Sequence, residues 1–245
     1  MAKLDDIVAF IPAAGLGTRL KPLTDNKPKA LVHFAGKTML EGVISRMFDL
    51  GIRKFIVNIH HFADFMMTEI SSLQSKYDIV ISDESNQLLD TGGGLVKAAG
   101  FHHETKTILV HNVDVFAQIN YTSLIDYHFE NRSDITMAVS QRDTSRKLLF
   151  VDNQLKGWKN FKTGETIGKS DSDDDKYLAF SGIHLVEAGV VKTNAPKEDV
   201  FPLIPWYVAN CNKLKIFNWL HDANNWFDLG TPERIQNAEY YLRKV

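Results

Sequence analysis

Short apolar runs alternate with longer amphipathic stretches through the first half of the chain. The short runs have the length and composition of buried strands, and the longer stretches repeat apolar side chains at helical spacing. Strands that alternate with helices indicate βαβ units and a parallel sheet, whose ligands bind at the carboxyl ends of the strands. Strands are predicted over residues 7–11, 54–59, 79–81 and 107–111, and helices over residues 38–50 and 62–73.

The second half of the chain mixes the two patterns at shorter intervals. Short antiparallel strands are predicted within residues 148–166, around a turn at Asp152-Asn153. The acidic run 169–176 lacks the pattern of a calcium-binding loop, so we expect a solvated, mobile loop. The remaining predicted elements are helices over 121–130, 200–209 and from Pro232, the last capped by Thr231, and strands over 134–140, 177–185 and 214–219.

A small, glycine-rich turn follows the first predicted strand. Ala14, Gly15 and Gly17 leave the backbone open, so its N–H groups can approach a phosphate or a base edge. Arg19 and Lys29 supply positive charge for a polyphosphate. The glycine spacing matches neither the dinucleotide nor the Walker fingerprint, so taken alone the turn is equally consistent with a plain strand-to-helix connection.

Three consecutive glycines follow Thr91. They suggest a flexible loop that feeds a helix N-terminus, whose free N–H groups suit a phosphate or a base. The alternative is a turn capped by Asp90 or Thr91. Because three glycines are conformationally costly, the pattern favours close approach of this backbone to another group.

Polar and charged residues mark three further places in the sequence. Asp114 follows the strand predicted at 107–111, where a carboxylate suits Mg²⁺ or caps the next turn, and His111 and Asn112 either line a site or satisfy the backbone. A cationic loop near residue 142 is a solvated face or a contact for a product phosphate. Its members are Arg142, Arg146 and Lys147.

Composition excludes several classes of protein. The chain has 245 residues, 44% of them hydrophobic, which is enough for one large α/β domain. A net charge of −2 does not favour nucleic acid as a partner, and no apolar window reaches the length of a membrane span. The single cysteine, Cys211, excludes an intramolecular disulfide, and with no signal-like N-terminus we expect a soluble, cytoplasmic protein.

The turn and the residues after it resemble the signature of the sugar-1-phosphate nucleotidylyltransferases. The matching string runs from Ala14-Gly15 through Gly17-Thr18-Arg19-Leu20 to Pro22-Leu23-Thr24, followed by Pro28-Lys29 and Leu31. Two later strings are similar to the same family, Phe180-x-Gly182-Ile183 and Trp226-x-Asp228-x-Gly230-Thr231-Pro232-Glu233. The Thr-Gly-Gly-Gly form at residue 91 is similar to the branch that includes N-acetylmuramate-1-phosphate uridylyltransferase. Val113 stands where the family has glycine before its metal-binding aspartate, and the family's Glu-Lys-Pro string is missing.

The resemblance implies an α/β fold of the Rossmann-like, three-layer α/β/α kind, with a mostly parallel mixed sheet and a small antiparallel sugar-binding sheet. It implies one domain over residues 1–245, with a nucleotide-binding half over about 1–115 and a sugar-phosphate-binding half over about 116–245. Arg19 would neutralise the leaving pyrophosphate, and Lys29 would hold phosphate oxygens. The other implied site residues are Ala13, Ala14, Gly15, Gly17, Thr18, Thr91, Gly92 and Gly93 for the nucleotide, Asn112, Lys159 and Gly182 for the sugar phosphate, and Asp114 and Asp228 for Mg²⁺.

The reaction that this implies joins a nucleoside triphosphate and a sugar 1-phosphate into a nucleotide-sugar, with release of pyrophosphate. UTP and an acceptor such as N-acetylmuramate 1-phosphate are favoured. GTP with mannose or heptose 1-phosphate, and CTP with a choline-type phosphate, are alternatives. A sensing module on the same fold stays open, and a glycosyltransferase is disfavoured because Asp114-Val115-Phe116 lacks the second Asp of a D-x-D motif. We expect a monomer or small homo-oligomer, with no nucleic-acid or membrane partner.

Overall fold

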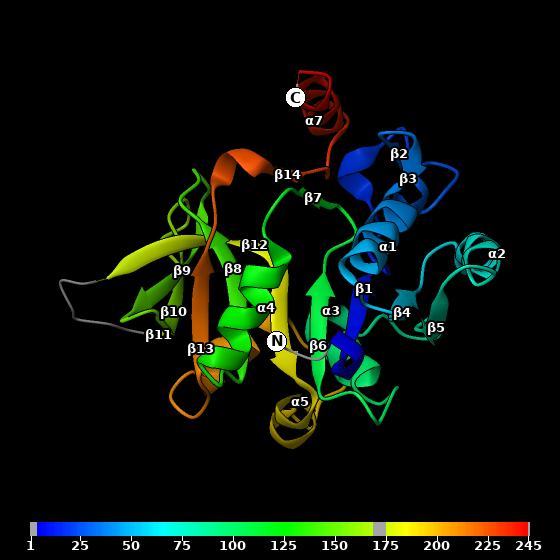
Figure 1. The fold of residues 1–245 in the computed structure, drawn as a ribbon. Helices are drawn as coiled ribbons and strands as arrows, with labels where there is room; N and C mark the ends of the chain where they lie inside the picture. The colour runs from blue at the N-terminus through cyan, green and yellow to red at the C-terminus, as the bar shows by residue number, and fades with distance from the viewer. Residues whose placement is uncertain (1–3, 169–174, 245) are drawn as a thin grey trace.

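The computed structural model describes residues 4–168 and 175–244, and most of the acidic run at 169–176 lies outside them. A ten-stranded sheet crosses the molecule in the order β11-β10-β13-β8-β12-β6-β1-β4-β5, and β9 pairs with both β10 and β12 (Figure 1). Helices cover both faces. Side chains of α1, α2 and α4 belong to one core cluster, and those of α3, α5 and α6 belong to the other.

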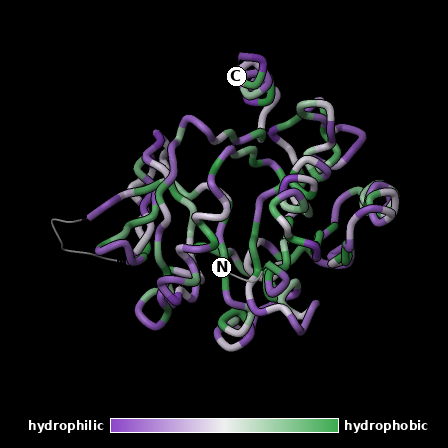
Figure 2. Tube along the Cα trace, viewed as in Figure 1, coloured by the Kyte–Doolittle hydropathy of each residue, from purple (hydrophilic) through white to green (hydrophobic). Residues whose placement is uncertain are grey.

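One half of the sheet is parallel. β1 (Ile7–Pro12) pairs in parallel with β4 (Lys54–Ile59) and with β6 (Thr107–His111), and β4 pairs in parallel with β5 (Asp78–Asp83). β6 is buried along its whole length because helices cover both of its faces. Figure 2 shows hydrophobic positions gathered in these central strands.

Helices α1 (Met39–Leu50), α2 (Ala63–Leu73) and α3 (Asp90–Ala98) connect these strands. Thr38 caps α1 by accepting a hydrogen bond from the backbone N–H of Glu41, and Gly51 ends the helix with a φ of 113°. This agrees with the helix predicted over residues 38–50.

The other half of the sheet is mixed. β12 (Lys176–Glu187) runs antiparallel to β6 and to β8 (Ile135–Ser140), and β13 (Ile216–Leu220) runs parallel to β8. The outer strands are antiparallel, but they are hydrogen-bonded into the large sheet rather than forming a separate one. They are β9 (Arg146–Val151), β10 (Gln154–Asn160) and β11 (Thr166–Gly168).

Two small pairs of strands lie outside this sheet. β2 (His33–Phe34) and β3 (Lys37–Thr38) form a hairpin, and β7 (Val115–Ala117) pairs with β14 (Trp226–Asp228) at the upper edge in Figure 1. The remaining helices are α4 (Tyr121–Glu130), α5 (Ala188–Asn194), α6 (Leu203–Asn210) and α7 (Pro232–Leu242). Short 3-10 turns cover Leu4–Asp6, Thr18–Leu20, Lys29–Leu31 and Ala223–Asn225.

The structure corrects three of the predicted elements. The flexible loop predicted at the three glycines is wrong, because Gly92, Gly93 and Gly94 lie inside α3. The cationic loop is shorter than predicted, since Arg146 and Lys147 begin β9. The helix predicted over 200–209 begins at Leu203, with Pro202 at its N-cap.

The last helix follows the prediction. Thr231 caps α7 by accepting a hydrogen bond from the backbone N–H of Arg234, and Pro232 occupies the first turn. Within residues 4–168 and 175–244, no helix is both long enough and apolar enough to span a bilayer.

Candidate functional site

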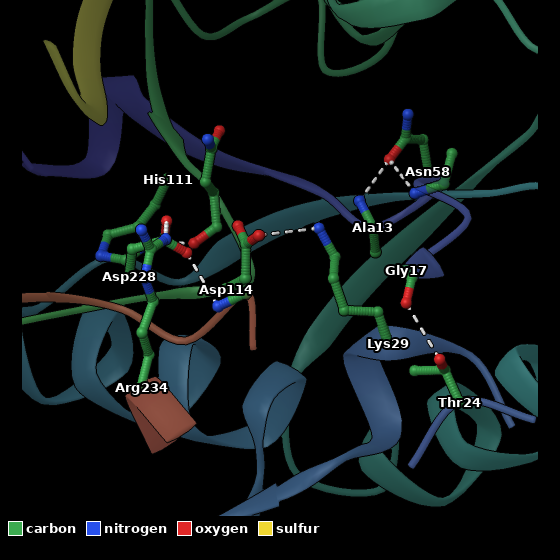
Figure 3. Close-up of polar contacts among 12 residues, drawn as sticks. Ala13, Gly17, Thr24, Lys29, Asn58, His111, Asp114, Asp228 and Arg234 are labelled. Carbon is green, nitrogen blue, oxygen red and sulfur yellow. Dashed lines mark hydrogen bonds and ion pairs between the residues drawn. The ribbon is translucent and has the colours of Figure 1, made fainter. Parts of the chain in front are cut away.

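The turn after β1 is fixed by hydrogen bonds to the side chain of Asn58 on β4. The Asn58 Oδ1 accepts hydrogen bonds from the backbone N–H groups of Ala13, at 2.6 Å, and Ala14, at 3.2 Å (Figure 3). These two N–H groups are therefore occupied by the protein itself. The N–H of Ala14, which was expected to be open to a phosphate or a base, is bonded to Asn58, but Ala14 lines a cavity with Gly15 and Asn58, and the assignment of Ala13 and Ala14 to the nucleotide stays a prediction.

Asn58 is one member of a buried relay. Its Nδ2 donates to Oε1 of Glu84 at 2.8 Å, and Oε2 of Glu84 accepts from the backbone N–H of Leu89 at 3.1 Å. Asn58 and Glu84 are both buried, so each hydrogen bond also offsets the cost of removing a polar group from water. The relay ties the turn after β1 to the segment that enters α3.

Gly17 fixes the second part of the turn. Its φ of 64° lies in the left-handed region, and a Cβ there would lie 2.9 Å from the Cβ of Lys29. Its carbonyl oxygen accepts a hydrogen bond from the Thr24 hydroxyl at 2.9 Å. Glycine is required here because the backbone passes directly beside Lys29.

Lys29 and Asp114 form an ion pair although they are distant in sequence. The Lys29 Nζ lies 3.0 Å from Oδ2 of Asp114, and the exposed fractions of the two side chains are 16% and 14%. In Figure 3, Asp114 is drawn between Lys29 on one side and Asp228 with Arg234 on the other. No partner for the other oxygen of Asp114 occurs among the described residues.

Asp228 reaches the same place through β14. Asp228 is in register with Val115 of β7, and the backbone N–H of Leu229 donates to the carbonyl of Asp114 at 2.8 Å. Oδ1 of Asp228 accepts a hydrogen bond from the backbone N–H of Gly230 at 2.7 Å, and Oδ2 of Asp228 pairs with the Arg234 guanidinium. The structure therefore brings both predicted metal-binding carboxylates to adjacent backbone segments.

Arg19 meets this pair at Gly230. A Cβ on Gly230 would lie 3.0 Å from Nη2 of Arg19 and 2.6 Å from Oδ1 of Asp228. Only a residue without a side chain leaves room for both groups. The exposed Arg19 side chain thus lies next to Gly230 and lines the same cavity as Asp114.

Two cavities meet at Lys29 and Asp114. One, of about 210 Å³, is lined by apolar and polar groups of β1, β4 and the entry to α3, including Phe10, Gly15, Thr91 and Asn112. The other, of about 280 Å³, is lined by Gly17, Thr18, Arg19 and Gly230. An elongated ligand with an apolar ring at one end and negative charge at the other matches this pair of cavities.

The glycines of α3 have a different role from the one predicted. A Cβ on Gly93 would lie 2.0 Å from the carbonyl oxygen of Asp199, and one on Gly92 would lie 2.3 Å from the Phe201 ring. The N–H of Gly92 donates to the carbonyl of Phe201 at 3.0 Å. The close approach that the sequence indicated is therefore an approach to the chain itself, and Thr91 is the member of this set that lines the first cavity.

The sugar-phosphate residues are divided. Gly182 has a φ of 72°, and a Cβ there would lie 2.8 Å from Nδ2 of Asn112. The backbone N–H of Asn112 donates to the Gly182 carbonyl at 2.9 Å. These two residues are brought together beside Asp114. Lys159 does not lie beside Asp114, because it lines neither cavity. It belongs to β10, and its Nζ lies 5.0 Å from the centre of the Phe161 ring.

His111, the last residue of β6, is a buried side chain whose two ring nitrogens have hydrogen-bond partners within the protein. Burial lowers the pKa of His111 to about 4, so its ring is neutral at physiological pH. Its Nε2 lies 2.9 Å from the hydroxyl of Tyr121, and its Nδ1 lies 2.9 Å from the carbonyl of Asn112. The alternative in which His111 satisfies polar neighbours is the one that the structure supports.

The carboxylate pair fits a magnesium ion bound together with phosphates. Mg²⁺ in proteins takes one or two carboxylates and fills its remaining positions with phosphate oxygens and water. Asp114 and Asp228 supply such a pair, although no group of three or more His, Cys, Asp or Glu side chains able to hold a metal occurs in the described part of the chain. Arg234, half-exposed on α7, has room to leave Asp228.

Three participating side chains were not predicted as site residues: Asn58, Glu84 and Arg234. A polar residue inside the apolar run 54–59 was a signal for Asn58, because buried polar side chains need partners. Arg234, one turn into α7, had no signal other than its closeness to Asp228 in sequence.

Known proteins resemble this chain in sequence. N-acetylmuramate alpha-1-phosphate uridylyltransferase of Caulobacter vibrioides is 40% identical over 110 residues, 44% of this chain and 45% of that protein. Mannose-1-phosphate guanylyltransferase of Mycobacterium tuberculosis is 27% identical over 249 residues, 92% of this chain and 61% of that protein. The chain thus matches less than two thirds of the length of either relative.

Solved structures resemble it in fold. HddC from Yersinia pseudotuberculosis, in complex with GMP-PN, has a TM-score of 0.72 at 21% identity, covering 96% of this chain and 99% of that one. The inositol-1-phosphate CTP transferase from T. maritima has a TM-score of 0.76 at 14% identity, covering 97% and 94%. This likeness confirms the predicted α/β class, the nucleotide-diphospho-sugar transferase fold.

A family model described as Nucleotidyl transferase matches residues 8–150. The matched region contains the turn after β1, Lys29, the Asn58–Glu84 relay, α3 and Asp114. Because it covers more than half of the 245 residues, the chain belongs to the nucleotidyl transferase family.

Proposed function

We propose that this protein is a sugar-1-phosphate nucleotidyltransferase. A phosphate oxygen of the sugar 1-phosphate attacks the α-phosphorus of a nucleoside triphosphate. The bond between that phosphorus and the bridging oxygen to the β-phosphate breaks, and pyrophosphate leaves. The attacking oxygen is already ionised at neutral pH, so the reaction requires positioning and charge neutralisation rather than a general base.

One observation carries the proposal. Arg19, Lys29 and Asp114 line one cavity, and Gly230 at its wall holds Asp228 beside Arg19. Two cations and one carboxylate that line a cavity, with a second carboxylate bonded to Gly230 at its wall, suit the transfer of a phosphoryl-type group, whose charge is spread over several oxygens.

Each side chain then has a task. Arg19 neutralises the pyrophosphate as it leaves, and Lys29 moves from Asp114 onto phosphate oxygens. Asp114 and Asp228 would hold Mg²⁺, which would supply charge neutralisation to the phosphates. Gly15 and Thr91 border the nucleoside, and Asn112 with Gly182 borders the sugar.

For the substrates we favour UTP and N-acetylmuramate 1-phosphate. The support is the 40% identity to the Caulobacter uridylyltransferase together with the Thr-Gly-Gly-Gly form at residue 91. GTP with mannose 1-phosphate is the competing pair, because guanylyltransferases match a larger share of the chain at lower identity.

The test is pyrophosphate release in the presence of Mg²⁺. UTP, GTP, CTP and dTTP are each crossed with the 1-phosphates of N-acetylmuramate, N-acetylglucosamine, mannose, glucose and heptose, and with phosphocholine. A signal confined to UTP and an amino sugar supports the substrates named above, and a signal with another pair replaces them. Silence across the panel from a folded protein that binds nucleotide would favour a sensing module instead.

A further inference from the structure

A third cavity lies next to Asp228. It measures about 330 Å³, and its lining includes Arg142, Thr144, Trp226, Asp228, Arg234 and Asn237. It shares no lining residue with the cavity that contains Arg19, Lys29 and Asp114. Apart from Asp228, the proposed reaction assigns no task to the residues that line this third cavity.

Arg142 is built into the wall of this cavity. Its Nη1 donates to the hydroxyls of Ser140, at 2.8 Å, and Ser181, at 3.1 Å, and its Nη2 donates to the carbonyl of Phe180. The guanidinium lies over the Trp226 ring, 3.8 Å from its centroid. Neutral acceptors and an aromatic face thus fix the group in one orientation.

Arg142 has no carboxylate partner. No Asp or Glu oxygen lies within 4.0 Å of its guanidinium among residues 4–168 and 175–244. Burial lowers the pKa of Arg142 to about 10, which reflects the water that this cation has lost. A fixed, partly desolvated guanidinium that faces a cavity is suited to an anion supplied by a ligand.

The acidic groups of the cavity do not remove this requirement. Asp228 is already engaged by Arg234 and by the N–H of Gly230. Asp143 also lines the cavity, but its side chain is exposed and makes no ion pair with Arg142. Thr144 and Asn237 add a hydroxyl and an amide that can donate to a carboxylate or to sugar hydroxyls.

The position of the cavity sets what the anion is. The proposed reaction assigns the reacting phosphate to Arg19, Lys29 and Asp114, which do not line this cavity, so we take an anion held at Arg142 to be a second charged group of the acceptor. We propose that the cavity binds a carboxylate carried by the acceptor sugar, with Arg142 as its main partner and Arg234 as a second cation. The proposal rests on the proposed function and narrows its substrate to an acidic sugar 1-phosphate.

The test compares two acceptors that differ only in a lactyl ether. N-acetylmuramate 1-phosphate is N-acetylglucosamine 1-phosphate with this group on one hydroxyl, so the ratio of their kcat/KM values reports the lactyl group, and the arginine variants report how much of that ratio comes from its carboxylate. We expect the wild-type protein to favour the acidic sugar by at least about tenfold, the scale of one hydrogen-bonded ion pair. Arg142→Gln should lower this ratio about 10- to 100-fold, and Arg142→Lys, which keeps the charge and loses the fork, should lower it less.

Two further variants keep the result readable. Arg234→Gln changes a half-exposed side chain and should also lower the ratio, so the proposal stays testable if Arg142→Gln does not fold. Arg132→Gln, at an exposed position between α4 and β8, is the matched control and should leave the ratio unchanged.

Three outcomes would overturn the carboxylate site. One is a wild-type protein that uses the neutral sugar as well as the acidic one. Another is an equal loss for both sugars in Arg142→Gln and Arg234→Gln, which would assign the arginines to the 1-phosphate or to the fold. The third is pyrophosphate release with mannose 1-phosphate in place of either amino sugar. Absence of release with every acceptor would instead contradict the proposed function itself.

Discussion

The two halves of the sheet support the site in different ways. In the parallel half, β1, β4 and β6 end at one edge, and the turn after β1 is fixed there by buried hydrogen bonds that its backbone donates to Asn58. In the mixed half, the corresponding groups reach the site through a bulged β12 and a short added strand, β14. The first half contributes a turn whose backbone is fixed by buried hydrogen bonds, and the second contributes side chains from a strand with a bulge and from a short strand pair. We infer that the first sets the chemistry and the second sets the acceptor.

The largest effect should come where the halves meet. Asp114→Asn removes a predicted metal ligand and leaves Lys29 without its ion pair, so kcat should fall about 100- to 1,000-fold. The measurement is the rate of pyrophosphate release with saturating substrates. Asp152→Asn, at the exposed β9–β10 turn, is the control. A rate near the wild-type value would remove Asp114 from the site.

The contact between the halves can be broken by one methyl group. Gly93→Ala places a Cβ against the carbonyl of Asp199, where backbone must move, and should lower the free energy of unfolding by about 1–3 kcal/mol. Gly42→Ala is the matched control, because Gly42 also lies inside a helix but has nothing within 4 Å of the added Cβ. That control should gain up to about 1 kcal/mol in urea-induced unfolding. Equal losses in both would mean that the effect of Gly93→Ala does not come from its contact with Asp199.

Two buried histidines lie on adjacent strands, one in each half of the sheet, and the pH dependence of the free energy of unfolding reports on both. Burial lowers the pKa of His111 on β6 to about 4 and that of His184 on β12 to about 3, below 6.5 in the unfolded chain. The unfolded chain then binds more protons, so stability present at pH 7 is lost as the pH falls through 6.5 toward those values. Each histidine should cost about 2 kcal/mol between pH 7 and pH 5.

Urea unfolding at pH 7 and pH 5 measures this loss. His184→Leu should show a smaller difference between the two pH values than the wild type, and the exposed His33→Gln should keep the wild-type difference. If His184→Leu keeps the full pH dependence, another group carries it.

The smallest effect should come from Lys159 on β10. Its ammonium lies over Phe161, and it lines none of the cavities beside Asp114 or Asp228. Lys159→Ala should therefore change kcat/KM for the sugar phosphate by less than about threefold, the scale of a lost exposed charge. A loss of 100-fold would restore the predicted role of Lys159 and weaken the division between the halves.

Sequence reasoning worked where local pattern decides the structure. The run 107–111, the helix at 121–130 and the Thr231–Pro232 cap each depend on neighbouring residues, and each lies where predicted. The turn after β1, Lys29 and Asp114 were singled out through the family resemblance, and the structure brings Lys29 and Asp114 together, as expected of groups at the carboxyl edge of a parallel sheet.

The predictions that failed depend on partners distant in sequence. Nothing near Gly92 indicates that Phe201 packs on it, so the glycines could be identified as a close approach but not assigned a partner. Arg142 has the same character, because its role follows from Trp226 and Ser181, which strands β14 and β12 bring to it. The roles of the site residues in catalysis stay predictions until the variants above are measured.

The pairing of β14 with β7 has a consequence for the protein during its synthesis. Asp114 leaves the ribosome with the first half of the sheet, whereas Asp228 and Gly230 are translated only after β12 and β13. The two carboxylates can therefore lie together only after the chain has been translated through β14, so the predicted metal site is among the last parts of the molecule to assemble.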